Sequence, residues 1–151
     1  MNAVTVGLAL ATGVGSALVP VLNAEAWALF AATGPVDTLL AVVLALAAGQ
    51  TVGKLVLFES GRRGRDWHPW RRRPVSARTA RWTDRVTGWL TSPRSGPPLV
   101  LAAASIGVPP LAVVSVAAGA AGQRRWVFVP LCLLGRTVRF SVLVLPLAVQ
   151  W

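Results

Sequence analysis

Residues 97–140 read PPLVLAAASIGVPPLAVVSVAAGAAGQRRWVFVPLCLLGRTVRF, and this stretch decides how the rest of the chain is arranged. Its first part, residues 97–122, carries no charge and is long enough to cross a bilayer once as a helix. Arg94 precedes this part and Arg124 follows it. Arginine-rich flanks prefer the cytoplasmic side of a membrane, so a single crossing would leave one flank on the unfavoured side.

Two prolines interrupt the apolar run at its centre. Gly107 is followed by Pro109 and Pro110, and proline lacks a backbone N–H and disfavours helical geometry in the residue before it. The pattern predicts a re-entrant hairpin over residues 97–122, with both ends in the cytoplasm. Such broken backbone requires protein or a water-filled cavity around it. The alternative is one spanning helix with a proline kink, because proline is common in membrane helices.

The composition indicates a membrane protein. Hydrophobic residues make up 54% of the 151 residues, charged residues 13%, and the mean hydropathy is +0.61. The net charge of +10 would suggest nucleic acid in a soluble protein, but ten of the fifteen basic residues lie within residues 59–95. We expect these basic residues to lie in a cytoplasmic loop that faces anionic lipid headgroups. No nucleic-acid partner is expected. Cys132, the only cysteine, is expected to be a packing residue.

The N-terminal part of the chain has a similar layout. Residues 3–34 form an apolar stretch broken at Pro20, which predicts a first re-entrant hairpin. Residues 36–58 follow as a spanning helix whose arginine-rich end marks the cytoplasmic side. Lys54 lies near that end, and we expect its side chain to extend toward the headgroups.

Residues 59–96 form the basic loop, and residues 76–90 within it have a helical pattern. One face of this segment combines tryptophan, valine and leucine with flanking arginines, which suits a helix lying in the headgroup layer. The residues expected at the membrane surface are Arg78, Trp82, Arg85 and Trp89, with Val86 and Leu90 on the same apolar face.

A last apolar stretch, residues 126–149, is expected to span the membrane outward. The predicted fold is therefore a single all-α integral membrane domain over residues 1–151. It contains two inverted repeats, each a proline-broken re-entrant hairpin followed by a transmembrane helix, joined by the basic loop. Inverted repeats of this kind are common in transporters.

Two arginines lie inside the last span, where charge is costly. Arg136 is about 15 Å from the start of the span and Arg139 follows one turn later. Placing each arginine at the centre of a membrane helix is expected to cost about 2.5–3.5 kcal/mol of insertion free energy. They are predicted to bind an anion or line a cavity; the alternative is a structural ion pair. Glu25 is an acid in an apolar arm and could pair with them or carry a proton.

Two proline-broken hairpins, the helix end ESGRRG and the segments AAGA and GRTVRF resemble the DedA family, also called SNARE-associated or VTT-domain membrane proteins. The resemblance extends from about Ala17 to Phe140. Members of this family are proposed to be lipid scramblases or proton-coupled transporters of lipid-linked phosphates, and the resemblance implies a similar function here.

The resemblance also implies site residues. The functional acids of the family match Glu25 and Asp37, twelve residues apart, as proton-coupling groups. An arginine at the mouth of the second hairpin matches Arg94. Val100 stands where a second family arginine is expected, and either Arg136 or Arg139 is a candidate replacement.

We therefore expect a non-enzymatic protein of the inner or plasma membrane that moves anionic lipid headgroups, phospholipid or polyprenyl phosphate, across the bilayer. Arg94, Arg136 and Arg139 would attract the phosphate, and no cofactor or metal is expected. The short chain leaves little room for a closed pathway, which favours a homodimer. The alternative function is a membrane adaptor that docks on anionic lipid or a partner protein through its basic, tryptophan-rich loop.

Overall fold

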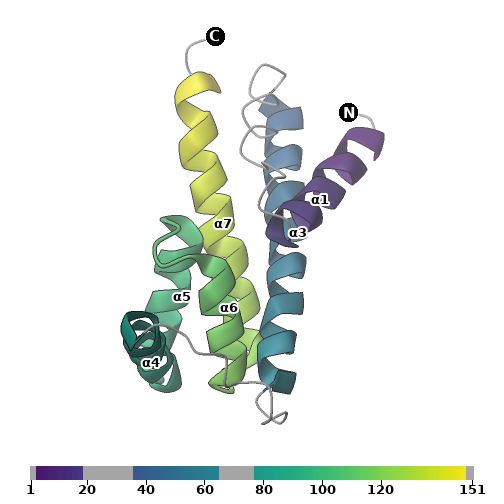
Figure 1. The fold of residues 1–151 in the computed structure, drawn as a ribbon. Coiled ribbons are helices and arrows are strands. Elements are labelled where there is room, and N and C mark those ends of the chain that lie inside the picture. The colour runs from purple at the N-terminus through teal and green to yellow at the C-terminus, as the bar shows by residue number, and fades with distance from the viewer. Residues whose placement is uncertain (1–2, 19–35, 65–76, 149–151) are drawn as a thin grey trace.

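The computed structural model describes residues 3–18, 36–64 and 77–148, and every regular element in these ranges is a helix. Helices α3 (Val36–Gly64) and α7 (Arg125–Ala148) are long and antiparallel and form the axis of the bundle (Figure 1). At about 1.5 Å per residue they measure about 43 and 36 Å, which exceeds the roughly 30 Å of a hydrocarbon layer. Among the described helices, these two have the length and apolar composition of membrane spans.

The end of the bundle that holds Gly64 and Arg125 is here called the basic end. Arg125 forms an ion pair with Glu59 there, with 2.7 Å between Nε and Oε1. This contact joins the C-terminal end of α3 to the N-terminal end of α7, as the antiparallel arrangement requires. Arg62 and Arg63 also lie in the last turn of α3.

Helix α3 ends later than expected. The sequence suggested an end at Phe58, whereas the helix continues to Gly64. Gly61 therefore lies inside the helix, and a Cβ there would collide with the carbonyl oxygen of Val116. The glycine allows two backbones to approach each other, so it is a packing residue.

Helix α1 (Ala3–Leu18) crosses the half of α3 that is far from the basic end (Figure 1). Their backbones are close, because a Cβ on Gly13 would lie 2.6 Å from the Leu46 carbonyl oxygen. This helix coincides with the first arm of the hairpin expected over residues 3–34. The predicted break at Pro20 and the second arm lie outside the described residues.

Helices α5 (Gly96–Ser105) and α6 (Leu111–Ala120) form a hairpin beside α7 (Figure 1). Each arm has ten residues, or about 15 Å, and the turn lies about halfway along α7. The turn contains Gly107, at φ +87°, and Pro109 and Pro110 follow it. The chain folds back here and does not continue as one kinked helix. Its re-entrance into a membrane and the inverted repeat stay predictions.

Helix α4 (Ala77–Thr91) packs on this hairpin. The residues of the expected apolar face have different environments. Val86 and Leu90 are buried in the bundle, whereas Trp89 is 54% exposed. The reason is geometric, because residues i and i+4 share a face and Trp89 lies at about 100° from Leu90 around the helix. The helix therefore uses its aliphatic residues for packing and presents its tryptophan outward.

Buried apolar residues form two clusters, one in each half of the bundle. The cluster far from the basic end joins α1, α3 and α7 and includes Ala47 and Phe140. The cluster near the basic end joins α3, α4, α5, α6 and α7 and includes Phe58, Phe128 and Cys132. The Phe58 and Phe128 rings stack with centroids 4.7 Å apart. Between the two clusters lie the polar side chains described next.

Candidate functional site

A layer of polar side chains crosses the bundle between the two apolar clusters. On α3 it occupies the stretch between Ala47 and Phe58, and on α7 the stretch between Cys132 and Phe140. These positions are near the middle of both long helices. The polar layer consists of Ser16 of α1, Gln50, Thr51 and Lys54 of α3, and Arg136 of α7, and Cys132 of the cluster near the basic end borders it.

Lys54 is the most deeply buried cation among the described residues, with 6% of its surface exposed. Its Nζ donates a hydrogen bond of 2.7 Å to the carbonyl oxygen of Ala17. Ala17 is in the last turn of α1, where carbonyl groups have no partner within the helix and the helix dipole favours a cation. The expectation that Lys54 extends to the headgroups is therefore wrong, because a neighbouring helix end binds its ammonium group inside the bundle.

Gln50 and Thr51 complete the α3 side of the polar layer. Gln50 Nε2 donates to Ser16 Oγ over 2.9 Å, and Ser16 Oγ donates to the Gly13 carbonyl oxygen over 3.0 Å. Gln50 Oε1 is buried and accepts no hydrogen bond from the described residues. Thr51 Oγ1 donates to the Ala47 carbonyl oxygen over 2.8 Å and also contacts the Cys132 thiol. The α1–α3 contact is thus polar at this level.

Arg136 brings a second cation to the same level. Its Nε is buried, and its charge lies close enough to that of Lys54 for the two to repel each other. Lys54 is about 15 Å from the end of α3 at Gly64, and Arg136 is about 16 Å from the start of α7 at Arg125. Two cations therefore share one depth, which is an arrangement that attracts an anion.

Arg139 has a different environment, although it is only one turn from Arg136. Its Nη1 donates to the Ile106 carbonyl oxygen over 2.8 Å, at the turn of the α5–α6 hairpin. It also lines an open cavity of about 440 Å³ together with Ser105, Val138 and Val142. The guanidinium group connects the long helix to the hairpin turn.

The structure places Arg94 and Asp37, two other predicted site residues, away from the polar layer. Arg94 is exposed in the turn between α4 and α5. Asp37 is in the first turn of α3, about 25 Å from Lys54 along the helix axis, and its side chain is outside the description. Glu25 and Pro20, and the side chains of Arg78 and Trp82, also lie outside the described residues. Arg85 is exposed on α4.

Sequence reasoning missed Lys54 and Gln50 as members of the site. Both are on α3 at i and i+4, so they share one face. That spacing of two polar side chains within an apolar span was the available signal. Their burial could not be read from it, because it depends on where α1 crosses α3.

Comparison with known proteins identifies the family. The family model of the VTT domain matches residues 19–149. No curated protein and no solved structure matched the chain. The match includes α3, α7 and the α5–α6 hairpin, and thus both long helices that carry the polar layer. The chain therefore belongs to the VTT-domain family of membrane proteins, also called the DedA or SNARE-associated family.

Proposed function

We propose that the protein moves anionic lipid headgroups, such as those of phospholipids or polyprenyl phosphates, across the bilayer. The observation that carries the proposal is the pair of cations Lys54 and Arg136 at mid-depth in two long apolar helices. Buried charges inside a membrane protein usually mark a substrate or ion pathway. Membership of a membrane-protein family is consistent with this role.

The physical basis is that an anion would relieve repulsion between the two cations. A phosphate passing the polar layer would exchange contacts with water for contacts with Lys54 and Arg136. The α5–α6 hairpin, whose arms are about 15 Å long, would shorten the apolar barrier on one side while the lipid tails stay in the bilayer. Arg94 and Arg139 would meet the headgroup at the hairpin foot and at the hairpin turn. Protonation of Glu25 and Asp37 would couple transport to a proton gradient.

Transport can be measured in proteoliposomes containing a trace of fluorescent anionic lipid in both leaflets, with a membrane-impermeant quencher added outside. With the natural protein, we expect the quencher to remove more fluorescence than the labelled lipid of the outer leaflet alone accounts for. Arg136→Ala and Lys54→Met should lower the rate about tenfold or more, since each removes one charge-assisted contact of about 1.5–3 kcal/mol. Arg136→Lys, which retains the charge, should retain part of the activity.

Arg63→Ala is the control, because this exposed arginine is on the same helix as Lys54 but outside the polar layer. Size-exclusion profiles and helical content verify folding of each variant. Full translocation by both Arg136→Ala and Glu25→Gln would falsify the mechanism.

A second candidate function is a membrane adaptor, and the exposed Trp89 on α4 favours it. Exposed Arg81 and Arg85 accompany the tryptophan, so α4 offers a basic and aromatic surface. An adaptor would lose function on substitution of Trp82, Trp89 or the arginines at 71–73, and would tolerate Arg136→Ala. The same set of variants therefore distinguishes the two functions.

A further inference from the structure

The basic end of the bundle contains a groove between the last turn of α3 and the first turn of α7. Its volume is about 480 Å³, and three arginines line it. Arg62 comes from α3, Arg124 from the α6–α7 turn and Arg125 from the start of α7. We call it the arginine groove; its remaining lining residues are Gly122, Gln123 and Trp126.

The charge in the arginine groove is only partly balanced. Glu59 forms an ion pair with Arg125, with 2.7 Å between Oε1 and Nε, and its Oε2 accepts a hydrogen bond of 3.4 Å from Arg125 Nη2. Among the described residues, this carboxylate pairs with Arg125, and Arg62 and Arg124 bring two further positive charges to the groove. The Arg124 carbonyl oxygen accepts the N–H groups of Val127 and Phe128, so α7 begins here and its dipole adds positive potential. Cations at a helix N-terminus are unfavourable for the helix itself, and an anion in the groove would offset that cost.

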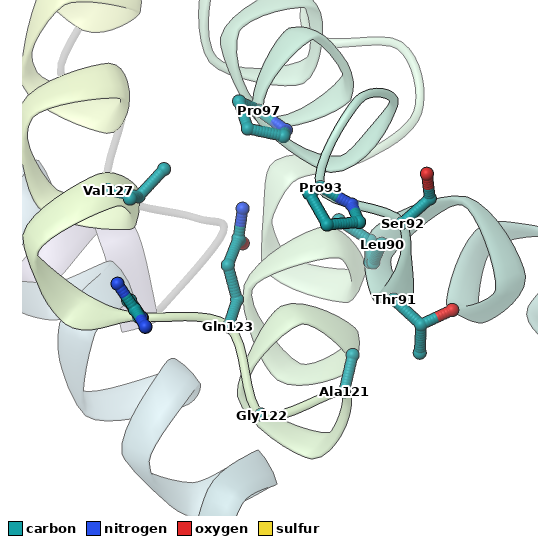
Figure 2. A pocket seen from close by; sticks show the side chains of 10 residues that line it. Leu90, Thr91, Ser92, Pro93, Pro97, Ala121, Gly122, Gln123 and Val127 are labelled. Atoms are coloured by element: carbon teal, nitrogen blue, oxygen red, sulfur yellow. The ribbon is translucent and has the colours of Figure 1, made fainter.

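A second hollow adjoins the arginine groove on the other side of Gly122, Gln123 and Arg124, which line both. Figure 2 shows this hollow, about 470 Å³ in volume, with the Gln123 side chain between α7 and the Pro97 end of α5. Its walls are mainly apolar and include Leu90, Pro93, Pro97, Ala121 and Val127. A cationic groove and an apolar hollow with a shared wall match the two parts of an amphiphile.

Trp126 places this region relative to a bilayer. It is 89% exposed and belongs to the first turn of a helix with the length and composition of a membrane span. Exposed tryptophans at the ends of such helices are typical of the headgroup level. The arginine groove is therefore at the depth where lipid phosphates are found.

We propose that these two hollows form a docking site for an anionic phospholipid. The arginine groove takes the phosphate group, and the apolar hollow takes the glycerol ester and the first part of an acyl chain. Arg62 and Arg124 donate to the phosphate, while Arg125 remains paired with Glu59. This site is distinct from the polar layer, and the inference holds whether or not lipid crosses the bilayer.

Binding can be tested on the full chain purified in a neutral detergent, by native mass spectrometry with titrated dioctanoyl phosphatidic acid. We expect saturable binding of this lipid and at least about tenfold weaker binding of dioctanoyl phosphatidylcholine, glycerol 3-phosphate and inorganic phosphate. Arg62→Gln and Arg124→Gln should each weaken binding of phosphatidic acid about tenfold, the size expected for one charge-assisted hydrogen bond.

Arg63→Gln is the matched control, because it removes the same charge from the neighbouring residue, which does not line the arginine groove. It should change the affinity less than twofold. Equal weakening by Arg62→Gln and Arg63→Gln would mean diffuse attraction and overturn the site. Inorganic phosphate binding as tightly as phosphatidic acid would indicate a soluble anion, and equal binding of phosphatidylcholine would indicate apolar contact alone; either result overturns the proposal. Arg136→Ala should still bind, which separates this test from the transport test.

Discussion

Arg136 and Arg139 are three residues apart on α7 and have different tasks in the structure. Arg136 faces the polar layer and the charge of Lys54, whereas Arg139 donates to the carbonyl oxygen of Ile106 in the hairpin turn. Ile106 is the C-cap of α5, so its carbonyl lies past the end of the helix and takes a donor from another element. A long side chain from α7 supplies it across the helix contact. The turn of the hairpin therefore depends on one distant residue.

Arg139→Met should weaken this turn. The lost hydrogen bond is expected to cost about 1–3 kcal/mol, since the Ile106 carbonyl would remain without that donor. We expect a lower melting temperature and about tenfold faster hydrogen exchange at the amides of Ile106 and Gly107, which bond to Ala102 and Ala103. The control is Arg63→Met at an exposed position, which should change neither quantity. Unchanged exchange in Arg139→Met would show that the turn holds without the arginine.

At the scale of elements, close backbone contacts hold α6 against α3. A Cβ on Gly119 would collide with the carbonyl oxygen of Phe58, and one on Gly61 with that of Val116. Within a membrane, apolar surface gains little from leaving lipid, so helix association depends on such close packing of small residues. The position of the hairpin beside the polar layer follows from these two glycines.

Gly119→Ala should therefore destabilise the bundle by about 1–3 kcal/mol, because the added methyl group has no room between the two backbones. Gly88→Ala is the matched control. Gly88 is in α4 with open space around it, so the same substitution should be neutral or stabilising by about 1 kcal/mol through helix propensity. Melting in detergent measures both. Equal melting temperatures for the two variants would contradict close packing at Gly119.

At the level of the whole molecule, the end of α3 at Gly64 and the start of α7 at Arg125 lie at the same end of the bundle (Figure 1). Arg94, before the hairpin, and Arg124, after it, are both exposed, and Arg124 lines the same hollow as Pro93, the neighbour of Arg94. In a membrane this arrangement predicts that both residues are accessible from the same side. The side opposite would carry the end of α7 at Ala148.

Cysteine labelling tests this topology in a Cys132→Ser background. We expect Arg94→Cys and Arg124→Cys to react with a membrane-impermeant reagent from the cytoplasm, and Asn2→Cys, Pro35→Cys and Gln150→Cys to react from outside. Gly122 is unsuitable as a probe, since its φ of +76° favours glycine. Labelling of positions 94 and 124 from opposite sides would contradict a re-entrant hairpin, and the inverted repeat with it.

The helical class and the break in residues 97–122 could be predicted from local chemistry, namely apolar runs of span length and prolines that cannot continue a helix. The family was recognisable from the resemblance of quoted segments, and the match over residues 19–149 confirms it. The last span was predicted over residues 126–149 from its apolar run, and α7 covers nearly the same residues, Arg125–Ala148. Arg136 and Arg139 were recognisable because charge is rare at that depth.

The tertiary structure alone decided which polar side chains meet. Lys54 is bound inside the bundle because the end of α1 crosses α3 at that residue, and no local pattern contains that crossing. Val86 and Leu90 of α4 turn inward because the hairpin offers them a surface, and the arginine groove exists because α3 and α7 end side by side. These features depend on contacts between residues far apart in the chain, and periodicity within one segment carries no information about them.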